Sequence, residues 1–520
     1  MGRGPRAVVL GVDSSTTGCK VLAFDREGAV AAEGRAPHRL DRVGTDGFEQ
    51  DASAWWTAMR AACEAARVGD LSVEAVCLTH QRETAVFVDR EGAPVGPAVV
   101  WMDKRSATRV AAFTGDRARF AAVTGKPVST TPSVFKLSER LAAGAVAAAH
   151  VDGVREVHGF LAERLVGAPV TSTASAGPMG LVDLQRGTWA RDLAAEVLGP
   201  VAAASWSWPR LVTPSTVMGP LTPAAAEALG LPAGIPVVAG AGDGQCAGLG
   251  AGITEPGRAY LNLGTAVVSG ALSATYDHGL GYRTMVAAVP GHYLRETDLQ
   301  GGTLTLTWLT ETLLGGAVSR TALEAEAAGI DPGAEGLVLV PYLAGVMNPY
   351  WDDTAAGVLV GLRPHHGPAH FYRAALEGIA LEVRLHLEAL VAAGADLDEV
   401  VLMGGGSRSD LWCQILADVI GRPLVRAVTP EATALGAGLL AAVGAGWHPD
   451  VEAAVGAFGA RRRRGRGFRP DARHAATYRD LYRGVYTGLY AAVAPHTRAL
   501  WSLRQGGGGE TATSEGRDET

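Results

Sequence analysis

One pattern occurs twice in this chain: an apolar strand, a short polar turn, and a second strand that returns beside the first. The first copy runs over residues 7–25 around the turn Asp13–Lys20, and the second over residues 258–270 around Gly264–Thr265. A hairpin of this kind at the start of each half indicates a duplicated architecture with one nucleotide bound between the two copies. Coincidence is the alternative, because polar hairpins of this kind are common.

The length of the chain agrees with two lobes. Its 520 residues exceed one ordinary core, so we expect two domains of about 250 residues each. The predicted division is an N-terminal domain over residues 1–252, a C-terminal domain over 253–504, and a disordered tail over 505–520 that is rich in Gly, Glu, Thr and Ser.

Composition narrows the class of protein. Hydrophobic residues make up 48% of the chain and charged residues 19%, as in a globular enzyme. The net charge of −7 argues against general nucleic-acid binding, and no apolar run is long enough to span a bilayer, so no membrane partner is expected. The five cysteines are scattered without metal-ligand spacing, which predicts reduced thiols in a cytoplasmic protein.

The first turn has the chemistry of a phosphate site. Thr16 and Thr17 can donate hydrogen bonds, backbone amides of the turn can form an anion-binding nest, and Lys20 adds a positive charge. Asp13, at the end of the first strand, is a candidate for holding Mg²⁺, directly or through a bound water. An ordinary polar hairpin is the alternative interpretation of this segment.

A second apolar strand, over residues 236–239, ends among small residues and then presents one carboxylate, Asp243. Flanking glycines keep bulk away from this carboxylate, so substrate and nucleotide can approach it closely, as a general base requires. A tight turn closed by an Asx hydrogen bond is the alternative.

Polar groups between two apolar strands predict the substrate site. Adjacent Arg82 and Glu83 are costly to bury unless they pair or hold a ligand, and together they suit a polyol. Trp101 offers a flat face for the C–H groups of a sugar, and Asp103 can accept hydrogen bonds from hydroxyls. The alternatives are a structural ion pair for Arg82 and Glu83 and core packing for Trp101.

Two glycine-rich segments in the second half precede predicted helices. A strand over residues 400–403 is followed by Gly404-Gly405-Gly406 and then by a helix that includes Asp410, the usual frame for a nucleotide. Gly301-Gly302 also opens a helix and can accept a phosphate there, although it can equally be a plain helix-start loop.

These motifs, in this order, resemble the FGGY carbohydrate kinases of the actin-like ATPase superfamily over about residues 8–500. The resemblance implies an α/β fold of two actin-like (ribonuclease H-like) domains, with ATP and Mg²⁺ in the cleft between them and the sugar mainly against the N-terminal domain. It implies that Asp243 is the general base for a primary hydroxyl. The implied phosphate and nucleotide contacts are Asp13, Thr16, Thr17, Lys20, Gly264, Thr265, Gly302, Gly405, Gly406 and Asp410, and the implied substrate contacts are Arg82, Glu83, Trp101, Asp103, Asp243 and Gln245.

The sequence indicates the identity of the acceptor less clearly than it indicates the type of reaction. Residues 81–84, Gln-Arg-Glu-Thr, look like the substrate motif of glycerol kinases, whereas Trp101-Met102-Asp103 resembles pentulose kinases. Thr131 and Val268 stand where glycerol kinases carry aromatic residues, which predicts a roomier pocket. We therefore expect a xylulokinase-like enzyme for a ketopentose, with glycerol or another polyol as the alternative.

Two other functions are alternatives to a kinase. Gly242-x-Gly244-x-x-Ala247 faintly matches a dinucleotide fingerprint, but Asp243 within it would repel a pyrophosphate. A non-catalytic actin-like sensor of sugar and nucleotide is the second, and the presence of both Asp13 and Asp243 argues against it. A small-molecule sugar or polyol is the expected partner, and a homodimer is compatible with the sequence.

Overall fold

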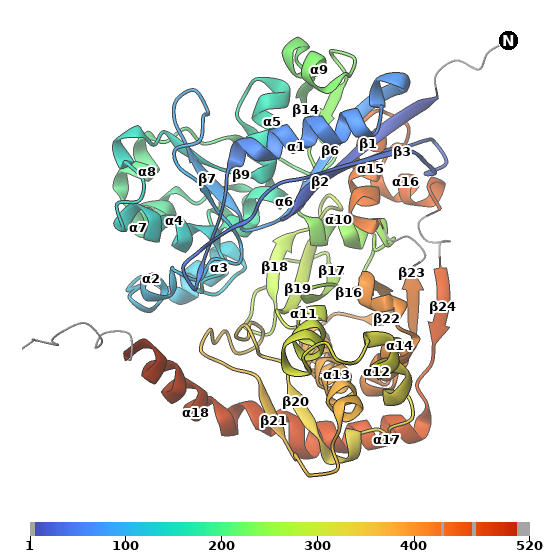
Figure 1. Cartoon of the computed structure of the whole chain (residues 1–520). Coiled ribbons are helices and arrows are strands. Elements are labelled where there is room, and N and C mark those ends of the chain that lie inside the picture. Colours follow the sequence, from blue (N-terminus) through green and yellow to red (C-terminus); the bar gives the residue numbers. More distant parts are fainter. Residues whose placement is uncertain (1–5, 428–430, 460–463, 507–520) are drawn as a thin grey trace, which may run out of the picture.

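The computed structural model describes residues 6–427, 431–459 and 464–506. Two mixed sheets dominate it, one in each lobe (Figure 1). The first sheet has the order β14-β15-β6-β1-β2-β3, with β14 (Val217–Pro220), β15 (Pro236–Val238), β6 (Ser72–His80), β1 (Ala7–Ser14), β2 (Gly18–Phe24) and β3 (Val30–Pro37). The second has the order β18-β19-β17-β16-β22-β23-β24, with β18 (Arg283–Val286), β19 (Tyr293–Leu299), β17 (Val267–Ser273), β16 (Gly257–Leu263), β22 (Leu397–Met403), β23 (Leu424–Ala427) and β24 (Arg464–Phe468).

The predicted duplication is confirmed by the strand pairing. In the first sheet β1 pairs antiparallel with β2 and parallel with β6, which pairs parallel with β15. In the second sheet β16 pairs antiparallel with β17 and parallel with β22, which pairs parallel with β23. Each lobe therefore repeats one ribonuclease H-like core. The first turn is shorter than predicted, because Asp13 and Lys20 lie inside β1 and β2 as direct cross-strand partners.

Smaller sheets and helices surround these cores. The first lobe adds a sheet of β4 (Asp41–Val43), β5 (Gly47–Gln50), β8 (Ala98–Val99), β7 (Ala85–Val88) and β9 (Gly153–Glu156). Three further pairs are β10 (Val170–Ser172) with β13 (Arg210–Val212), β11 (Val182–Asp183) with β12 (Thr188–Trp189), and β20 (Val338–Val340) with β21 (Val358–Val360). The helices are α1 (Ala52–Ala65), α2 (Ala107–Ala111), α3 (Arg117–Thr124), α4 (Ser133–Ala142), α5 (Val157–Val166), α6 (Thr173–Ala176), α7 (Arg191–Leu198), α8 (Pro200–Ser205), α9 (Pro223–Leu229), α10 (Asp243–Gly250), α11 (Thr303–Thr307), α12 (Arg320–Ala327), α13 (Pro368–Ala392), α14 (Asp410–Ile420), α15 (Ala432–Gly444), α16 (Val451–Ala457), α17 (Ala472–Leu481) and α18 (Thr487–Gly506). Among the described helices, none combines the length and the apolar character needed to cross a membrane.

Helices α15 and α16 come from the second half of the chain but pack on the first sheet (Figure 1). Their apolar side chains share one buried cluster with Val9, Phe24 and Val238 of that sheet. The predicted division at residue 252 thus separates the two sheets but not the helices. Of the predicted tail, residues 505 and 506 end α18, and residues 507–520 lie outside the described part.

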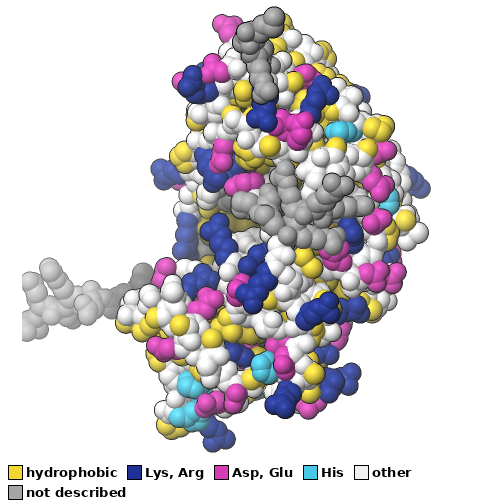
Figure 2. All heavy atoms as spheres, turned by 90° about the vertical axis from the view of Figure 1, so that its right-hand side faces the viewer, with side chains coloured by type: hydrophobic (Ala, Val, Ile, Leu, Met, Phe, Trp, Pro, Cys, Tyr) yellow, Lys and Arg dark blue, Asp and Glu magenta, His cyan; other side chains and the backbone are white. Residues whose placement is uncertain are grey.

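Figure 2 shows the face that carries β23, β24 and α16, where basic and acidic side chains are intermixed. The run of four arginines at residues 461–464 predicts a solvated basic loop. In the structure Arg464 begins β24, and residues 461–463 lie outside the described part. Nearby, Asp410 forms ion pairs with Arg426 of β23 and Arg466 of β24. These three charges are therefore paired with one another.

The contact between α10 and α15 depends on Gly436. A Cβ at this position would lie 2.0 Å from the backbone oxygen of Cys246 in α10, which cannot move aside like a flexible side chain. We expect Gly436→Ala to destabilise the protein by about 3 kcal/mol, since overpacking forces the backbone to shift. Thermal or urea unfolding measures the effect.

Gly456 provides the matched control for this prediction. It lies in helix α16, and a Cβ there would meet no atom within 4 Å. Gly456→Ala should stabilise the protein by up to about 1 kcal/mol through helix propensity. Equal responses of the two variants would contradict the packing argument.

Candidate active site

Three parallel strands of the first sheet deliver the principal polar groups to one edge. Asp13 lies near the end of β1, the Arg82–Glu83 pair follows β6, and Asp243 follows β15. A bridge between His80 and Gly242 brings the last two chain segments together. Ligands of open α/β sheets bind at such carboxyl ends, so the topology makes this edge the candidate site.

Asp243 is the first residue of α10 and presents a carboxylate of which only one oxygen is engaged. Its Oδ1 accepts hydrogen bonds from the Gly244 amide at 2.8 Å and from Arg82 Nε at 2.9 Å. The side chain is 43% exposed, and no hydrogen bond to Oδ2 is found within the described residues. A Cβ on Gly242 would lie 2.3 Å from Arg82 Cδ, so this glycine is needed for Arg82 to reach Asp243. Asp243 Oδ2 is therefore open to a ligand as far as the described residues show, and its role as a base stays a prediction.

Asp13 lies close enough to Asp243 for the two charges to interact. Burial raises the pKa of Asp13 to about 7, with a further contribution from the Asp243 carboxylate. Asp13 Oδ1 is buried and is without a hydrogen-bond partner among the described residues. Carboxylate oxygens are the donors that Mg²⁺ prefers, so Asp13 fits the magnesium role that the family resemblance implies.

The turn between β1 and β2 holds the other residues of the first predicted phosphate site. Thr16 Oγ1 accepts a hydrogen bond from Trp101 Nε1 at 3.0 Å, which joins this turn to the predicted substrate face. Thr17 is exposed. The Lys20 ammonium pairs with Glu431, which directly precedes α15. Lys20 is thus tied to a carboxylate in this structure, and phosphate binding by it stays a prediction.

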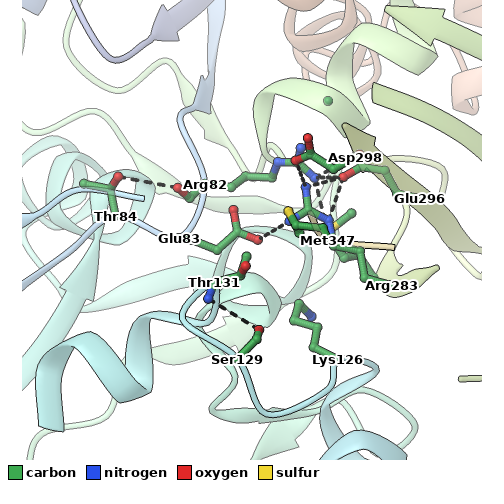
Figure 3. A network of polar contacts seen from close by, with 12 residues as sticks. Arg82, Glu83, Thr84, Lys126, Ser129, Thr131, Arg283, Glu296, Asp298 and Met347 are labelled. Carbon is green, nitrogen blue, oxygen red and sulfur yellow. Dashed lines mark hydrogen bonds and ion pairs between the residues drawn. The ribbon is translucent and has the colours of Figure 1, made fainter. Parts of the chain in front are cut away.

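Arg82 and Glu83 are both buried, and both make ion pairs across the lobe boundary (Figure 3). Arg82 Nη1 donates to the two oxygens of Glu296 on β19, at 2.8 and 3.0 Å. Glu83 Oε1 accepts from Arg283 Nη1 of β18 at 3.2 Å. Although burial by itself would raise the pKa of Glu296, Arg82 and Arg283 hold it below its usual value.

Sequence reasoning missed Arg283, Glu296 and Asp298. Glu296 and Asp298 stand two apart on β19 and so share one face, which was a detectable signal for charges on a buried strand. Arg283 becomes their neighbour only through the pairing of β18 with β19, where it lies opposite Glu296. The sequence alone does not predict this strand pairing or its register.

The predicted contacts of Asp103 and Gln245 with the sugar stay predictions, and in this structure both side chains make hydrogen bonds within the protein. Asp103 is 1% exposed; its Oδ1 accepts from the Arg105 amide, and its Oδ2 accepts from the Phe48 amide and Arg105 Nε. Gln245 Nε2 donates to the backbone oxygens of Ala174 and Val286, both at 2.9 Å. The hydrogen-bonding capacity of Asp103 is used to shape its own loop, and the Gln245 amide nitrogen joins the two lobes.

The predicted nucleotide segments of the second lobe gather at the ends of β16 and β22. The start of α11 rests on the second turn, because the Thr303 amide donates to Gly264 O at 2.9 Å and the Leu304 amide to Thr265 O at 3.2 Å. This places Gly302 directly against Gly264–Thr265. Gly405 and Gly406 form a 3₁₀ turn between β22 and α14. Asp410 is held by Arg426 and Arg466, so its contact with a nucleotide stays a prediction.

Comparison with known proteins gives consistent matches over nearly the whole chain. Residues 8–250 match the N-terminal domain of the FGGY family of carbohydrate kinases, and residues 259–445 match the C-terminal domain. A glycerol kinase of Aromatoleum aromaticum is 33% identical over 490 residues, covering 88% of this chain and 93% of that protein. A xylulose kinase of Staphylococcus epidermidis is 27% identical over 467 residues, covering 87% and 91%. The crystal structure of xylulose kinase from Rhodospirillum rubrum superposes with a TM-score of 0.85 at 30% identity, covering 94% of this chain and all of that one.

Proposed function

Because the chain belongs to the FGGY family of carbohydrate kinases, we propose that it transfers the γ-phosphoryl group of ATP to a primary hydroxyl of a ketopentose. Phosphoryl transfer from ATP to a carbohydrate is the activity of the family. The choice of acceptor and the roles of individual residues are our proposal. The observation that carries it is the Asp243 carboxylate, half-exposed and oriented by Arg82, which interacts electrostatically with Asp13, whose buried Oδ1 has no hydrogen-bond partner among the described residues.

The proposed chemistry needs one proton acceptor and several fixed charges. Asp243 Oδ2 takes the proton of the attacking hydroxyl, while Oδ1 stays held by Arg82 and the Gly244 amide. The hydroxyl oxygen forms the new P–O bond as the bond to the ADP oxygen breaks. Asp13 holds Mg²⁺, which when bound neutralises charge on the phosphates. The turns at Thr16–Thr17 and Gly264–Thr265 cradle those phosphates.

Two features favour a ketopentose over glycerol. Thr131 stands where glycerol kinases carry an aromatic residue, so its smaller side chain suits a longer acceptor; Figure 3 draws it in the same region as Glu83. Trp101 is joined to the phosphate turn through Thr16, so a sugar lying along the indole would extend toward the reacting phosphate.

The five cysteines are all free and buried, which fits activity in the reducing cytoplasm.

Glycerol or another polyol is the second candidate. The segment Gln81–Thr84 supports it, because the buried Arg82 and Glu83 keep atoms for which no hydrogen bond is found within the described residues, and these suit adjacent hydroxyls. The match to the glycerol kinase of Aromatoleum aromaticum covers 88% of this chain and 93% of that protein.

A coupled ATPase assay with Mg²⁺ tests the proposal. Acceptors are D-xylulose, L-xylulose, D-ribulose, xylitol, D-arabitol, ribitol, erythritol and glycerol, with the acceptor-free rate as baseline. We expect the highest kcat/KM with a ketopentose. A preference for glycerol or a pentitol would select the second candidate, and ATP binding without turnover on any acceptor would favour a sugar and nucleotide sensor.

A further inference from the structure

Strands β18 and β19 belong to the second sheet by pairing, but β18 is fastened to the first lobe. The Thr284 amide donates to Gly125 O at 2.8 Å, and Gln245 Nε2 donates to Val286 O at 2.9 Å. The buried Lys126 ammonium donates to Thr284 O at 3.4 Å. Strand β18 therefore contacts the first lobe directly, in the region where residues 81–84 lie.

From this edge, Arg283 and Glu296 contact both members of the Arg82–Glu83 pair. Arg283 and Glu296 are direct cross-strand partners and are 2% and 0% exposed. Arg283 Nε donates to Glu296 Oε1 at 2.9 Å, and Tyr260 OH donates to Glu296 Oε2 at 2.8 Å. The ion pairs form one continuous chain in the order Asp243, Arg82, Glu296, Arg283 and Glu83. Figure 3 shows the part of this chain from Arg82 to Glu83.

The backbone of Glu83 is held in a strained conformation. Its φ of +52° lies in the left-handed region, which is unfavourable for a glutamate. Arg283 makes the one ion pair found for its carboxylate within the described residues. Arg283 thus holds Glu83 in an orientation that the chain would not adopt readily by itself.

Arg82 and Glu83 keep hydrogen-bonding capacity for a ligand. No bond is found for Arg82 Nη2 or for Glu83 Oε2 within the described residues. The two residues retain 7% and 5% of their surface exposed. One donor group and one acceptor atom therefore remain, fixed relative to each other by Glu296 and Arg283.

We propose that Arg283 and Glu296 are positioning residues of the acceptor site, which therefore extends across the lobe boundary. They hold the guanidinium of Arg82 and the carboxylate of Glu83 at the spacing that binds two hydroxyls of the acceptor. This inference rests on the proposed function, because it takes Arg82 and Glu83 as acceptor ligands. Fixing ligand groups through a supporting shell lowers the cost of ordering them when the acceptor binds.

Arg283→Met is the direct test, measured with the preferred acceptor of the wild type. We expect the KM for the acceptor to rise about 100-fold, the effect of displacing substrate-binding groups by about 1 Å. The KM for ATP should stay within about 2-fold, because Arg283 contacts none of the proposed nucleotide segments. Arg283→Lys keeps the positive charge but not the planar set of N–H donors of the guanidinium. The acceptor KM of this variant should therefore fall between those of wild type and Arg283→Met.

Arg295→Met is the matched control. Arg295 is also a buried arginine on this strand pair, lying opposite Thr284, and its Nη1 donates to Ala393 O rather than toward residues 81–84. Its acceptor KM should stay within about 3-fold of wild type, even where stability falls. An unchanged acceptor KM in Arg283→Met, or an equal rise in both variants, would overturn the proposal.

Hydrogen–deuterium exchange on the ligand-free proteins separates this inference from the proposed function. Amides of residues 81–85 should exchange at least about 10-fold faster in Arg283→Met than in wild type, and be unchanged in Arg295→Met. If the wild type phosphorylates no acceptor of the panel, the proposed function fails, yet this exchange result still decides whether Arg283 holds the loop. Unchanged exchange in Arg283→Met would refute the positioning role.

Discussion

Asp243→Asn should lower kcat about a thousand-fold, within the range observed when a general base is removed. The amide keeps the shape of the side chain and can still accept from Arg82 Nε and the Gly244 amide through its oxygen. It cannot take a proton from the acceptor hydroxyl. Binding of ATP and acceptor should therefore stay within a few-fold of wild type, which isothermal titration measures, while the single-turnover rate of phosphoryl transfer should fall about a thousand-fold.

Asp243→Glu provides the companion measurement. It keeps a carboxylate but moves it by one methylene, so we expect a loss of about 100-fold, smaller than that of the asparagine variant. A change of KM with kcat preserved would assign Asp243 to binding alone. Turnover of Asp243→Asn within a few-fold of wild type would exclude it as the base.

The sequence predicted the parts of the fold whose signals are local. Both hairpins follow from apolar runs broken by short polar turns, and the two runs beginning at Ala7 and Arg258 are the first strands of two equivalent cores. The position of α15 was not predictable in this way. Its Ala- and Gly-rich sequence has no marked apolar face, and 10 of its 13 residues are buried, so only the three-dimensional fit to α10 and the first sheet selects its place.

In the candidate site, too, the residues with local sequence signals were predictable and the long-range pairs were not. Asp243 and the Arg82–Glu83 pair were predictable because each follows a strand, and parallel neighbours end at one edge. The engagement of Asp103 by Arg105 was overlooked although the two are only two residues apart. The partners of Lys20 and Glu83 lie more than 190 residues away, at Glu431 and Arg283, and no local pattern predicts such pairs.

Glu296→Gln should be among the most destabilising single substitutions in this protein. Donors from Arg82, Arg283 and Tyr260 converge on the two oxygens of Glu296, which is 0% exposed. An amide places an N–H₂ group against one set of these donors and removes the charge that compensates two buried guanidiniums. Breaking a buried ion pair from one side costs about 3–5 kcal/mol, a large part of the stability of an ordinary domain. Urea and thermal unfolding of the ligand-free protein measure the loss.

Two further variants decide whether this cost comes from the buried network. Glu33→Gln removes a partner of Arg35 in an exposed ion pair and should change stability by no more than about 0.5 kcal/mol. Arg283→Met combined with Glu296→Gln removes one of the two stranded guanidiniums, so its cost should be clearly less than the sum of the single costs. Additive costs would mean that Arg283 and Glu296 act independently. The chain of charges from Asp243 to Glu83 would then be a set of separate pairs, and Glu296 would support Arg82 alone.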